Sequence, residues 1–328
     1  MKVTISDVAE LAGVAKSTVS RYLNGGYVSD ETRKKINKVI KDTNYEPNTF
    51  AQSLKAKKTN LIGVIIPRLN SYTGALLLKG IDETLRGANY QMLISNTDQK
   101  IEREIESLYN FVNQKVAGIV LITANLTEEH ERAINEISIP VLVVGQDHEK
   151  LPSLSYADKE AGYAVGNYVT SRGHRQFIYL GVTEEDVAVG IKRKQGFLEA
   201  IEKVKDCEVS YYESSFLMEG AKKLFSEIIK KEDNQAKTLV VCATDNIALG
   251  VMKAVRQQGL QVPQDISITG FGDYEIADLM ELTTIQYPYQ EVGNLTAKKI
   301  VSLSEGKEIE TVINKQFTLI ERGSVAVI

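Results

Sequence analysis

The spacing of hydrophobic residues divides the chain into a short helical region and a long region of alternating strands and helices. Apolar residues recur at helical spacing over 5–12, 16–24 and 30–40. From residue 61 onward, short apolar runs alternate with amphipathic segments. Such alternation is typical of parallel sheets covered by helices on both faces. The pattern therefore predicts an all-α N-terminal domain followed by an α/β domain.

The long region is divided into strands and helices of ordinary length. Strands are expected at 61–66, 91–95, 118–122, 141–144, 177–180, 239–242 and 266–269. Helices are expected near 73–88, 100–115, 128–137, 159–172, 190–204, 218–231 and 246–258. At 328 residues the chain is too long for one core. We therefore expect two α/β lobes with a ligand cleft at the carboxyl ends of their strands.

The N-terminal region has the signals of a helix-turn-helix. Thr4 and Asp7 are spaced as a capping box at the start of the first helix, and Gly13 ends that helix. Ser29 is placed to cap a third helix. Two short helices joined by a tight turn, with a third closing a small core, make up this motif.

The second of these helices has two different faces. Val19 and Leu23 share the inward face, whereas the opposite face carries Ser17, Thr18 and Arg21. Hydroxyl groups and an arginine one turn apart suit base edges and phosphates in the major groove. A generic three-helix bundle with a solvated polar face fits the same pattern. Periodicity alone leaves both interpretations open.

Charge and composition narrow the function. The net charge is −4, but residues 1–60 carry 11 basic and 6 acidic side chains. A basic head on an acidic body indicates that one end meets a polyanion. No apolar run approaches the ~20 residues that span a bilayer, and the start has no apolar signal region, so we expect a cytoplasmic protein without a membrane partner.

Catalytic signatures are missing from the sequence. It has neither of the standard glycine-rich phosphate loops and no His-Glu-x-x-His. The three histidines, His130, His148 and His174, are scattered without an evident nucleophile partner. Cys207 and Cys242 are too few for a disulfide framework or a structural zinc site. We expect a protein that is not an enzyme, with no cofactor and no metal.

The first 65 residues or so carry a specific resemblance. The ordered elements DVA, AGV, STVSRYLN, V-S-x-x-T-R, Y-x-P-N, A-x-x-L and T-x-x-I-G-V-I-I-P resemble the start of lactose/galactose-repressor (LacI/GalR) family transcription regulators. The resemblance implies a homodimeric repressor on a near-palindromic double-stranded operator. It also implies a DNA-binding domain at 1–46, a hinge at 47–58 and a sugar-binding and dimerisation domain at 59–328.

The resemblance also implies which residues contact DNA in the head. One departure is Ala15, where the family usually has a serine that caps the recognition helix and reaches a phosphate. Alanine is a poor cap. Lys16 or Ser17 would then take over that contact. The implied head contacts are Thr4, Lys16, Ser17, Thr18, Ser20, Arg21, Asn24 and Ser29.

The hinge is expected to be a short helix of about 49–55. Roughly eight residues cannot hold a stable helix alone, because nucleation is too costly for so few bonds. The resemblance implies paired hinge helices in the minor groove, with Leu54 as a wedge and Ala51 as the small residue that lets the helices approach. Asn48 and Lys55 complete the implied contacts. Alternatively, Leu54 is only a linker residue on the lobe surface.

For the body, the resemblance implies the periplasmic-binding-protein-like (type I) sugar-binding fold with three crossovers. These are expected near 156–159, 286–289 and 317–319. The first lobe would then comprise about 59–157 and 289–316, and the second about 158–286 and 317–328.

Candidate effector-binding residues come from two lines of reasoning. Loops that follow strands supply Arg68, Asn70, Ser71, Tyr72 and Asn125. The family's ligand-side positions match Arg193, Thr244, Asp245, Asp273 and Tyr289, and Phe216 adjoins another. Arg193 could instead be an exposed helix cation.

Several of these positions depart from the family pattern. Gly272 stands for the first acid of the usual pair, Gly145-Gln146 replaces a usual Asp-Arg, and Ser215 holds the place of an aromatic, with Phe216 beside it. An altered set of polar groups indicates an altered ligand.

Within the family, the segments IPRLNSY, VVGQ, TGFGDYE and TTIQYPY are most similar to the sucrose-operon repressors. That similarity implies an inducer such as sucrose 6-phosphate, or another sugar or sugar phosphate. The nearest alternative is a catabolite-type regulator whose co-repressor ligand or phosphorylated carrier protein tightens DNA binding. A sugar-binding receptor and a sugar-processing enzyme are further alternatives from other classes.

Overall fold

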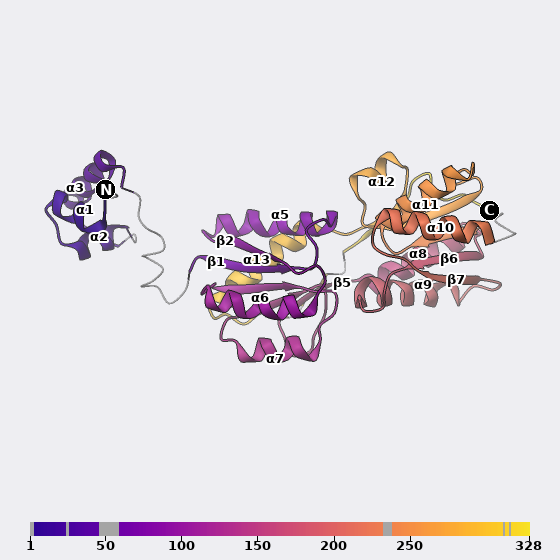
Figure 1. Ribbon diagram of the computed structural model, residues 1–328, viewed down its shortest axis with the longest axis horizontal. Helices are drawn as coiled ribbons and strands as arrows, with labels where there is room; N and C mark the ends of the chain where they lie inside the picture. Colours follow the sequence, from indigo (N-terminus) through magenta and orange to yellow (C-terminus); the bar gives the residue numbers. More distant parts are fainter. Residues whose placement is uncertain (1–2, 24–25, 46–58, 232–237, 311, 315) are drawn as a thin grey trace. The chain divides into compact units, whose positions relative to one another are not determined.

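A computed structural model describes residues 3–23, 26–45, 59–231, 238–310, 312–314 and 316–328. The chain divides into two units, residues 1–59 and 60–328. Figure 1 shows the three-helix head and the two α/β lobes of the second unit. Within the described residues, no helix is long and apolar enough to cross a membrane.

The head contains helices α1 (Ile5–Ala12), α2 (Lys16–Leu23) and α3 (Asp30–Thr43). The predicted capping box is present: the Thr4 backbone N–H donates to Asp7 Oδ2 at 2.8 Å, and the Asp7 N–H donates to Thr4 Oγ1 at 3.4 Å. Gly13 ends α1 with a φ of 63°, a left-handed conformation that favours glycine. All three helices contribute to one small core, formed by Val8, Ala9, Ala12, Val19 and Ile36.

The first lobe is built on a six-stranded parallel sheet in the order β11-β5-β4-β3-β1-β2. Its strands are β1 (Leu61–Ile66), β2 (Gln91–Asn96), β3 (Gly118–Ile122), β4 (Val141–Val144), β5 (Ser153–Tyr156) and β11 (Val312–Asn314). Its helices are α5 (Tyr72–Gly87), α6 (Ile101–Asn113), α7 (Glu128–Glu136) and α13 (Tyr289–Ser304).

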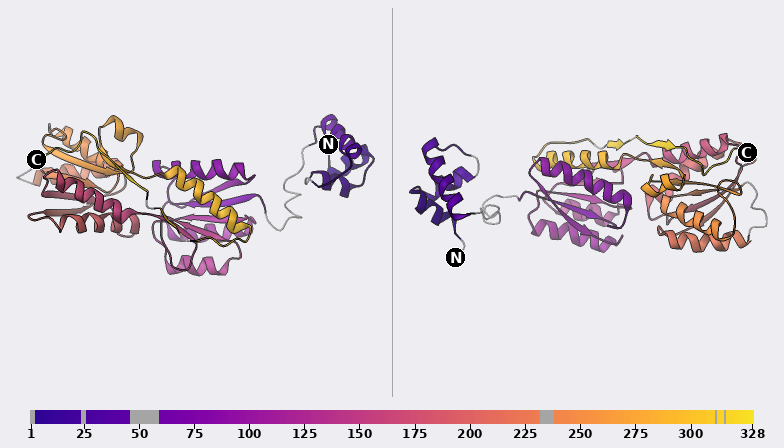
Figure 2. Two further views of the ribbon diagram at one scale, coloured as in Figure 1. Left: turned by 180° about the vertical axis from the view of Figure 1, so that it is seen from behind. Right: turned by 90° about the horizontal axis from the view of Figure 1, so that it is seen from above.

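Side-chain alternation along β1 places one helix pair on each face of this sheet. Ile62 and Val64 belong to the core under α5 and α13, whereas Ile65 belongs to the core under α6 and α7. Helices α5 and α13 lie side by side (Figure 2). They approach closely at Gly80, where an added Cβ would lie 2.0 Å from the Gln290 carbonyl oxygen. A side chain at Gly80 would therefore force the two helices apart.

The second lobe repeats the plan with a sheet in the order β12-β10-β9-β8-β6-β7. Its strands are β6 (Gln176–Gly181), β7 (Glu208–Glu213), β8 (Thr238–Cys242), β9 (Ile266–Phe271), β10 (Thr283–Gln286) and β12 (Thr318–Ile320), the last antiparallel to β10. Its α-helices are α8 (Asp158–Ser171), α9 (Arg193–Ile201), α10 (Met218–Lys231), α11 (Asp245–Gln257) and α12 (Glu275–Leu279).

One observation refines the predicted elements. The helix expected at 190–204 is a π-helical segment, Val187–Lys192, followed by α9.

The chain passes between the lobes three times: after β5, after β10 and between β11 and β12. These passages bring the carboxyl ends of both sheets to one cleft.

Candidate functional site

The exposed face of α2 is the candidate DNA-reading surface of the head. Val19 is fully buried and fixes the rotation of the helix, so Lys16, Ser17 and Arg21 are exposed to solvent. Thr18 and Ser20 are half-buried beside them. The Tyr22 hydroxyl donates to Asn37 Oδ1 at 2.6 Å and ties α2 to α3. The predicted polar face is therefore held on a packed scaffold.

The remaining predicted DNA contacts have different placements. Thr4 caps α1, and Ser29 caps α3 by accepting from the Thr32 N–H at 3.4 Å. Tyr27, which precedes α3 and is not among the predicted contacts, has 86% of its surface exposed. The other predicted contacts lie outside the described residues: Asn24 after α2, and Asn48, Ala51, Leu54 and Lys55 in the hinge.

In the second unit, a cleft opens between the two lobes at the carboxyl ends of their strands. Its cavity volume is about 170 Å³, and its mouth is open to solvent. Loops after β1, β2, β3 and β4 line it from the first lobe, and α8, the Val187–Lys192 segment and residues near β8 and β9 line it from the second. Tyr156 and Tyr289 line it where the chain passes between the lobes.

Arg193 is buried in the wall of this cleft. Its Nε donates to Asp158 Oδ1 at 2.7 Å, and its Nη1 donates to the Ala243 carbonyl at 2.8 Å. The guanidinium carbon lies 5.0 Å from the Phe271 ring centroid and 5.4 Å from that of Tyr287. Burial opposes the charge, but the neighbouring Asp158 carboxylate prevails and the pKa of Arg193 lies well above its ordinary value. Arg193 is thus a buried cation with a buried counter-ion and not an exposed helix cation.

Arg68, in the loop after β1, has a different environment. Its guanidinium carbon lies 4.1 Å from the ring centroid of Phe216, which belongs to the second lobe. Burial lowers the pKa of Arg68, and the charges of Tyr274 and Asp186 oppose that shift. Among the described residues, no carboxylate lies within 4.0 Å of its guanidinium. Arg68 therefore presents an incompletely compensated positive charge to the cleft.

Asp186 is an acidic side chain of the cleft lining whose charge acts on Arg68. Its Oδ1 accepts from the Val189 N–H at 3.0 Å, which starts the π-helical segment. Burial raises the pKa of Asp186, and its hydrogen bond with Val189 and the charge of Arg193 oppose that shift. The cleft therefore contains both signs of charge, in addition to hydroxyl, amide and aromatic groups.

Six of the eleven predicted effector-binding residues line the cleft: Arg68, Ser71, Arg193, Phe216, Thr244 and Tyr289. The hydroxyl of Ser71 caps α5 and that of Thr244 caps α11, so the positive ends of two helices face the cleft. A patch with this polarity suits a ligand that carries oxygen acceptors.

The other five predicted residues are not among the lining residues. Asn70 is exposed and Asn125 half-buried, next to the lining residue Ala124. Tyr72 contacts Tyr274 of the second lobe, with ring centroids 4.9 Å apart. Asp273 pairs with Arg322 at 2.8 Å and accepts from Gln286 at 2.6 Å.

Asp245, the last of these five, supports the cleft from behind. Its Oδ1 accepts from the Thr284 hydroxyl at 2.5 Å, and its Oδ2 accepts from the Tyr274 N–H at 2.9 Å. Burial raises the pKa of Asp245 to about 6. Because Tyr274 lines the cleft, Asp245 acts on the site through the backbone of that residue.

Sequence reasoning missed several polar lining residues. The same rule that found Arg68 could have found Gln99 and Gln146, because each follows a strand of the first lobe within three residues. Asp158 and Tyr274 also follow strands, β5 and β9, within three residues, whereas Asp186 lies five residues after β6.

Comparison with known proteins bears on both units. The family described as "Bacterial regulatory proteins, lacI family" matches residues 4–48, and "Periplasmic binding protein-like domain" matches residues 167–325. The fold resembles the lac repressor dimer bound to operator and the anti-inducer ONPF, with a TM-score of 0.91, 24% identity and coverage of 99% of this chain and 100% of that one. These matches confirm the predicted head and two-lobed domain.

Two curated relatives match over nearly the whole length. The sucrose operon repressor of Staphylococcus xylosus is 36% identical over 308 residues, 93% of this chain and 95% of the relative. Catabolite control protein A of Priestia megaterium is 29% identical over 326 residues, 95% of this chain and 96% of the relative. The chain belongs to the lacI family of bacterial regulatory proteins and is a DNA-binding transcription regulator.

Proposed function

We propose that the protein represses a sugar-utilisation operon, with sucrose as the favoured sugar, and that a sugar or sugar phosphate releases it from its operator. Regulators of this family bind operator DNA and sugar effectors as dimers. The observation that carries the proposal is the near full-length 36% identity with a sucrose operon repressor. The combination of charged, polar and aromatic groups in the cleft supports it.

For the head, we propose that α2 enters the major groove of each half-site. Exposed Ser17 and Arg21 lie on the face opposite the buried Val19, as base and phosphate contacts require. In the hinge, Asn48, Ala51, Leu54 and Lys55 are proposed to contact the minor groove, with Leu54 opening a central base step. A two-fold symmetric dimer would bind a near-palindromic operator.

For the cleft, we propose that the two arginines have separate tasks. The charge of Arg193 is balanced by Asp158, so Arg193 would donate hydrogen bonds to sugar hydroxyls. Arg68 has no carboxylate this close among the described residues, so it would bind the phosphate of a sugar phosphate. Tyr156 lines the cleft and its buried hydroxyl has no hydrogen-bond partner among the described residues, so we propose that the ligand supplies one. The ring of Tyr289 would contact an apolar face of the sugar.

We propose that the effector acts by shifting a population. An occupied cleft would favour one arrangement of the lobes, and that arrangement would separate the two hinge segments of the dimer. The Val187 N–H donates to the Ala124 carbonyl at 3.2 Å across the cleft, and Lys192 pairs with Asp147 across it. Contacts such as these would differ between arrangements. The effect on DNA affinity is limited to the effector's preference, typically about 1–3 kcal/mol.

The test has two steps. A thermal-shift screen with sucrose, sucrose 6-phosphate, fructose and trehalose 6-phosphate identifies the effector. An operator is then selected from randomised duplexes, and the effector is titrated into the complex. Release from DNA supports the proposal, whereas an effector that leaves DNA binding unchanged contradicts it.

A second candidate is a catabolite-type regulator, in which the ligand would raise the affinity for DNA and not lower it. The 29% identity over 326 residues with a catabolite control protein favours it. In that case a co-repressor ligand or a phosphorylated carrier protein would tighten the complex. The same titration distinguishes the two, because the sign of the change in DNA affinity differs.

A further inference from the structure

Two buried ionisable side chains in the first lobe lie outside the cleft lining. His130 of α7 is fully buried and Glu104 of α6 is 3% exposed, and His130 Nε2 lies 2.9 Å from Glu104 Oε2. Taking a carboxylate out of water is costly unless it is hydrogen-bonded. A residue pair of this kind at the contact between two helices therefore requires an explanation beyond packing.

The hydrogen bonds of His130 fix its tautomer. The Thr127 backbone N–H donates to His130 Nδ1 at 3.2 Å. A backbone N–H can only donate, so Nδ1 is the acceptor and Nε2 carries the hydrogen that is donated to Glu104. His130 thereby occupies the place of the glutamate or glutamine in a capping box at the start of α7.

This capping links His130 to one loop of the cleft. Thr127 is the last residue of the loop between β3 and α7. Within this loop, the Thr123 hydroxyl donates to the Asn125 carbonyl at 3.0 Å. Thr123 and Ala124 line the cleft. The Ala124 carbonyl also accepts from Gln146 Nε2 at 2.6 Å, in addition to the contact from Val187 of the second lobe.

The other oxygen of Glu104 is directed at a second loop of the cleft. The Thr97 hydroxyl lies 3.3 Å from Glu104 Oε1, and the Thr97 N–H donates to the Ile66 carbonyl at 3.0 Å. Two further bonds tie the segments after β1 and β2 together: Gln99 N–H to the Pro67 carbonyl at 3.0 Å, and Leu69 N–H to Asn96 Oδ1 at 3.1 Å. Arg68 lies between these two attachments.

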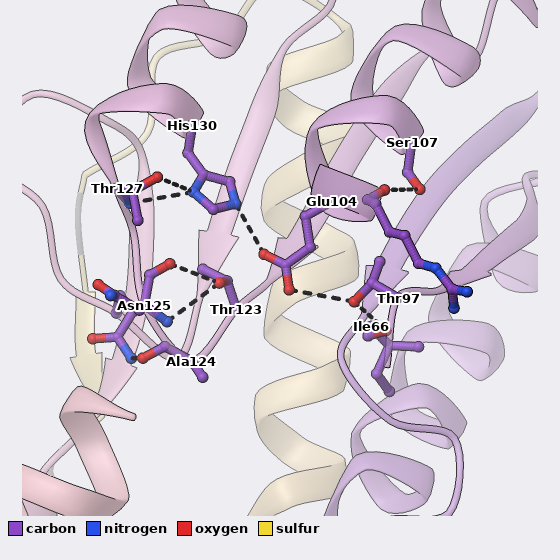
Figure 3. A network of polar contacts seen from close by, with 11 residues as sticks. Ile66, Thr97, Glu104, Ser107, Thr123, Ala124, Asn125, Thr127 and His130 are labelled. Carbon is purple, nitrogen blue, oxygen red and sulfur yellow. Dashed lines mark hydrogen bonds and ion pairs between the residues drawn. The ribbon is translucent and has the colours of Figure 1, made fainter. Parts of the chain in front are cut away.

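Figure 3 shows Glu104 between His130 on one side and Thr97 on the other. We infer that Glu104 and His130 are positioning residues for the effector cleft, because one carboxylate joins the loop that carries Arg68 to the loop that carries Ala124. Neither side chain lines the cleft. They act by keeping two first-lobe loops in one relative position, so that both meet the same ligand.

The chain offers a matched control at the other end of the same helices. The Tyr109 hydroxyl of α6 donates to Glu136 Oε2 of α7 at 2.6 Å, near the carboxyl ends of both helices. Helix amino ends follow the carboxyl ends of parallel strands, so the Tyr109 contact lies away from the cleft. Tyr109→Phe removes a hydrogen bond between α6 and α7 without touching the cleft loops.

The first test is amide hydrogen exchange on the full chain without any ligand. In His130→Leu we expect about tenfold faster exchange of the Thr97, Gln99 and Leu69 amides. These amides lie in loops that His130 contacts only indirectly, through its hydrogen bond to Glu104. His130→Gln supplies an acceptor and a donor again and should restore slow exchange. Tyr109→Phe should leave these amides unchanged. Faster exchange confined to the first turn of α7 in His130→Leu would overturn the inference.

Thr97→Val provides a second variant should His130→Leu fail to fold. It keeps the shape of the side chain and removes only the hydroxyl between Glu104 and the Ile66 carbonyl. We expect faster exchange at Leu69 and Gln99 with no change at Thr127. Unchanged exchange at Leu69 and Gln99 would contradict the inference.

A binding measurement with sucrose 6-phosphate as the probe completes the test, and this part rests on the proposed function. We expect about tenfold weaker binding in His130→Leu and less than about twofold change in His130→Gln and Tyr109→Phe. If the unaltered protein does not bind the probe, the proposed effector is wrong and the exchange result alone decides the inference. If it binds and folded His130→Leu binds equally well, the inference is wrong.

Discussion

Arg193 and Asp158 form a buried ion pair in the wall of the cleft, with Nε 2.7 Å from Oδ1 and less than a tenth of either side chain exposed. The two residues are 35 positions apart, at the starts of α9 and α8. Tyr287 also donates its hydroxyl to Asp158 Oδ1 at 3.0 Å. The pair therefore joins two helices and a passage between the lobes at one point of the site.

Arg193→Ala should reduce both stability and sugar binding. The change leaves a buried carboxylate without its partner, which costs about 3–5 kcal/mol. The double variant Arg193→Met/Asp158→Asn should recover much of the stability but not the sugar affinity. Chemical denaturation and calorimetric titration measure the two effects. Lys307→Ala, which breaks an exposed pair with Glu305, is the control and should cost less than about 1 kcal/mol. Unchanged sugar affinity in Arg193→Ala would show that the cleft assignment is wrong.

Arg68→Met should remove the preference for a phosphorylated ligand. The variant keeps an unbranched side chain against Phe216 and loses the cation. We expect the ratio of affinities for sucrose 6-phosphate and sucrose to fall about tenfold, because one charge-assisted contact is worth roughly 1.5–3 kcal/mol. Arg86→Met, on the exposed side of α5, should leave the ratio unchanged. An equal loss of affinity for both ligands would contradict a phosphate role.

The stability of the protein should depend on pH through Asp245. Because burial raises the pKa of Asp245 to about 6, the folded chain binds this proton more readily than the unfolded chain does. The buried carboxylate therefore opposes folding above pH 6 by up to about 3 kcal/mol, and this penalty fades as the pH falls from about 6 to 4.

Replacing Asp245 isolates this effect from other titrating groups. The difference in unfolding free energy between Asp245→Asn and the unaltered protein should shift in favour of the variant as the pH rises from 4 to about 7. Denaturation curves at several pH values measure this slope, which is independent of any constant cost of the substitution. A difference that stays flat across this range would contradict the assignment.

Arg21→Ala should weaken operator binding and reduce its salt dependence. An arginine that contacts a phosphate or base edge contributes about 1–3 kcal/mol, and removing one arginine–phosphate interaction lowers the slope of log K against log salt by roughly one. Lys35→Ala removes the same charge from α3, where Lys35 pairs with Glu31. It should change binding much less. Equal effects of the two variants would indicate that only the net charge of the head matters.

Leu54→Ala tests the hinge, whose residues lie outside those described. If Leu54 opens a base step, the smaller side chain should weaken operator binding about tenfold and leave sugar affinity unchanged. Val327→Ala, at an exposed position near the carboxyl end, serves as the control. Operator affinity equal to that of the control would support the interpretation of Leu54 as a simple linker residue.

Hydrophobic periodicity predicted most of the framework, because buried strands and amphipathic helices leave a strong local signal. The expected strand at 61–66 has the same bounds as β1. Strand β7 was missed because it is an edge strand with the pattern EVSYYE, in which four of the six residues are exposed. Local sequence does not distinguish such a segment from a loop.

The polar groups of the site were harder to predict, since their partners are distant in sequence. His130 lies among acidic residues in EEHERA and resembles a surface position, yet it is fully buried against Glu104 of α6. Asp186 was likewise identified only in the folded structure, where it lines the cleft.

Membership of the lacI family confirms the expectation that the protein is a transcription regulator and not an enzyme. The family resemblance in the first 65 residues carried this prediction. Departures at Gly145-Gln146 and Gly272 limited what could be predicted of the ligand, because each removes a side chain that the family usually offers.

An occupied cleft should lower the affinity of the head and hinge for operator DNA, and the proposed release of the repressor by its effector depends on this coupling. The most direct test is fluorescence anisotropy of a labelled, selected operator at about 150 mM salt, with sucrose and sucrose 6-phosphate titrated into the complex. We predict sequence-specific binding and a drop in anisotropy on saturation, equivalent to a roughly tenfold or greater loss of affinity. Tighter binding with ligand, or no preference among duplexes, would contradict the proposed coupling.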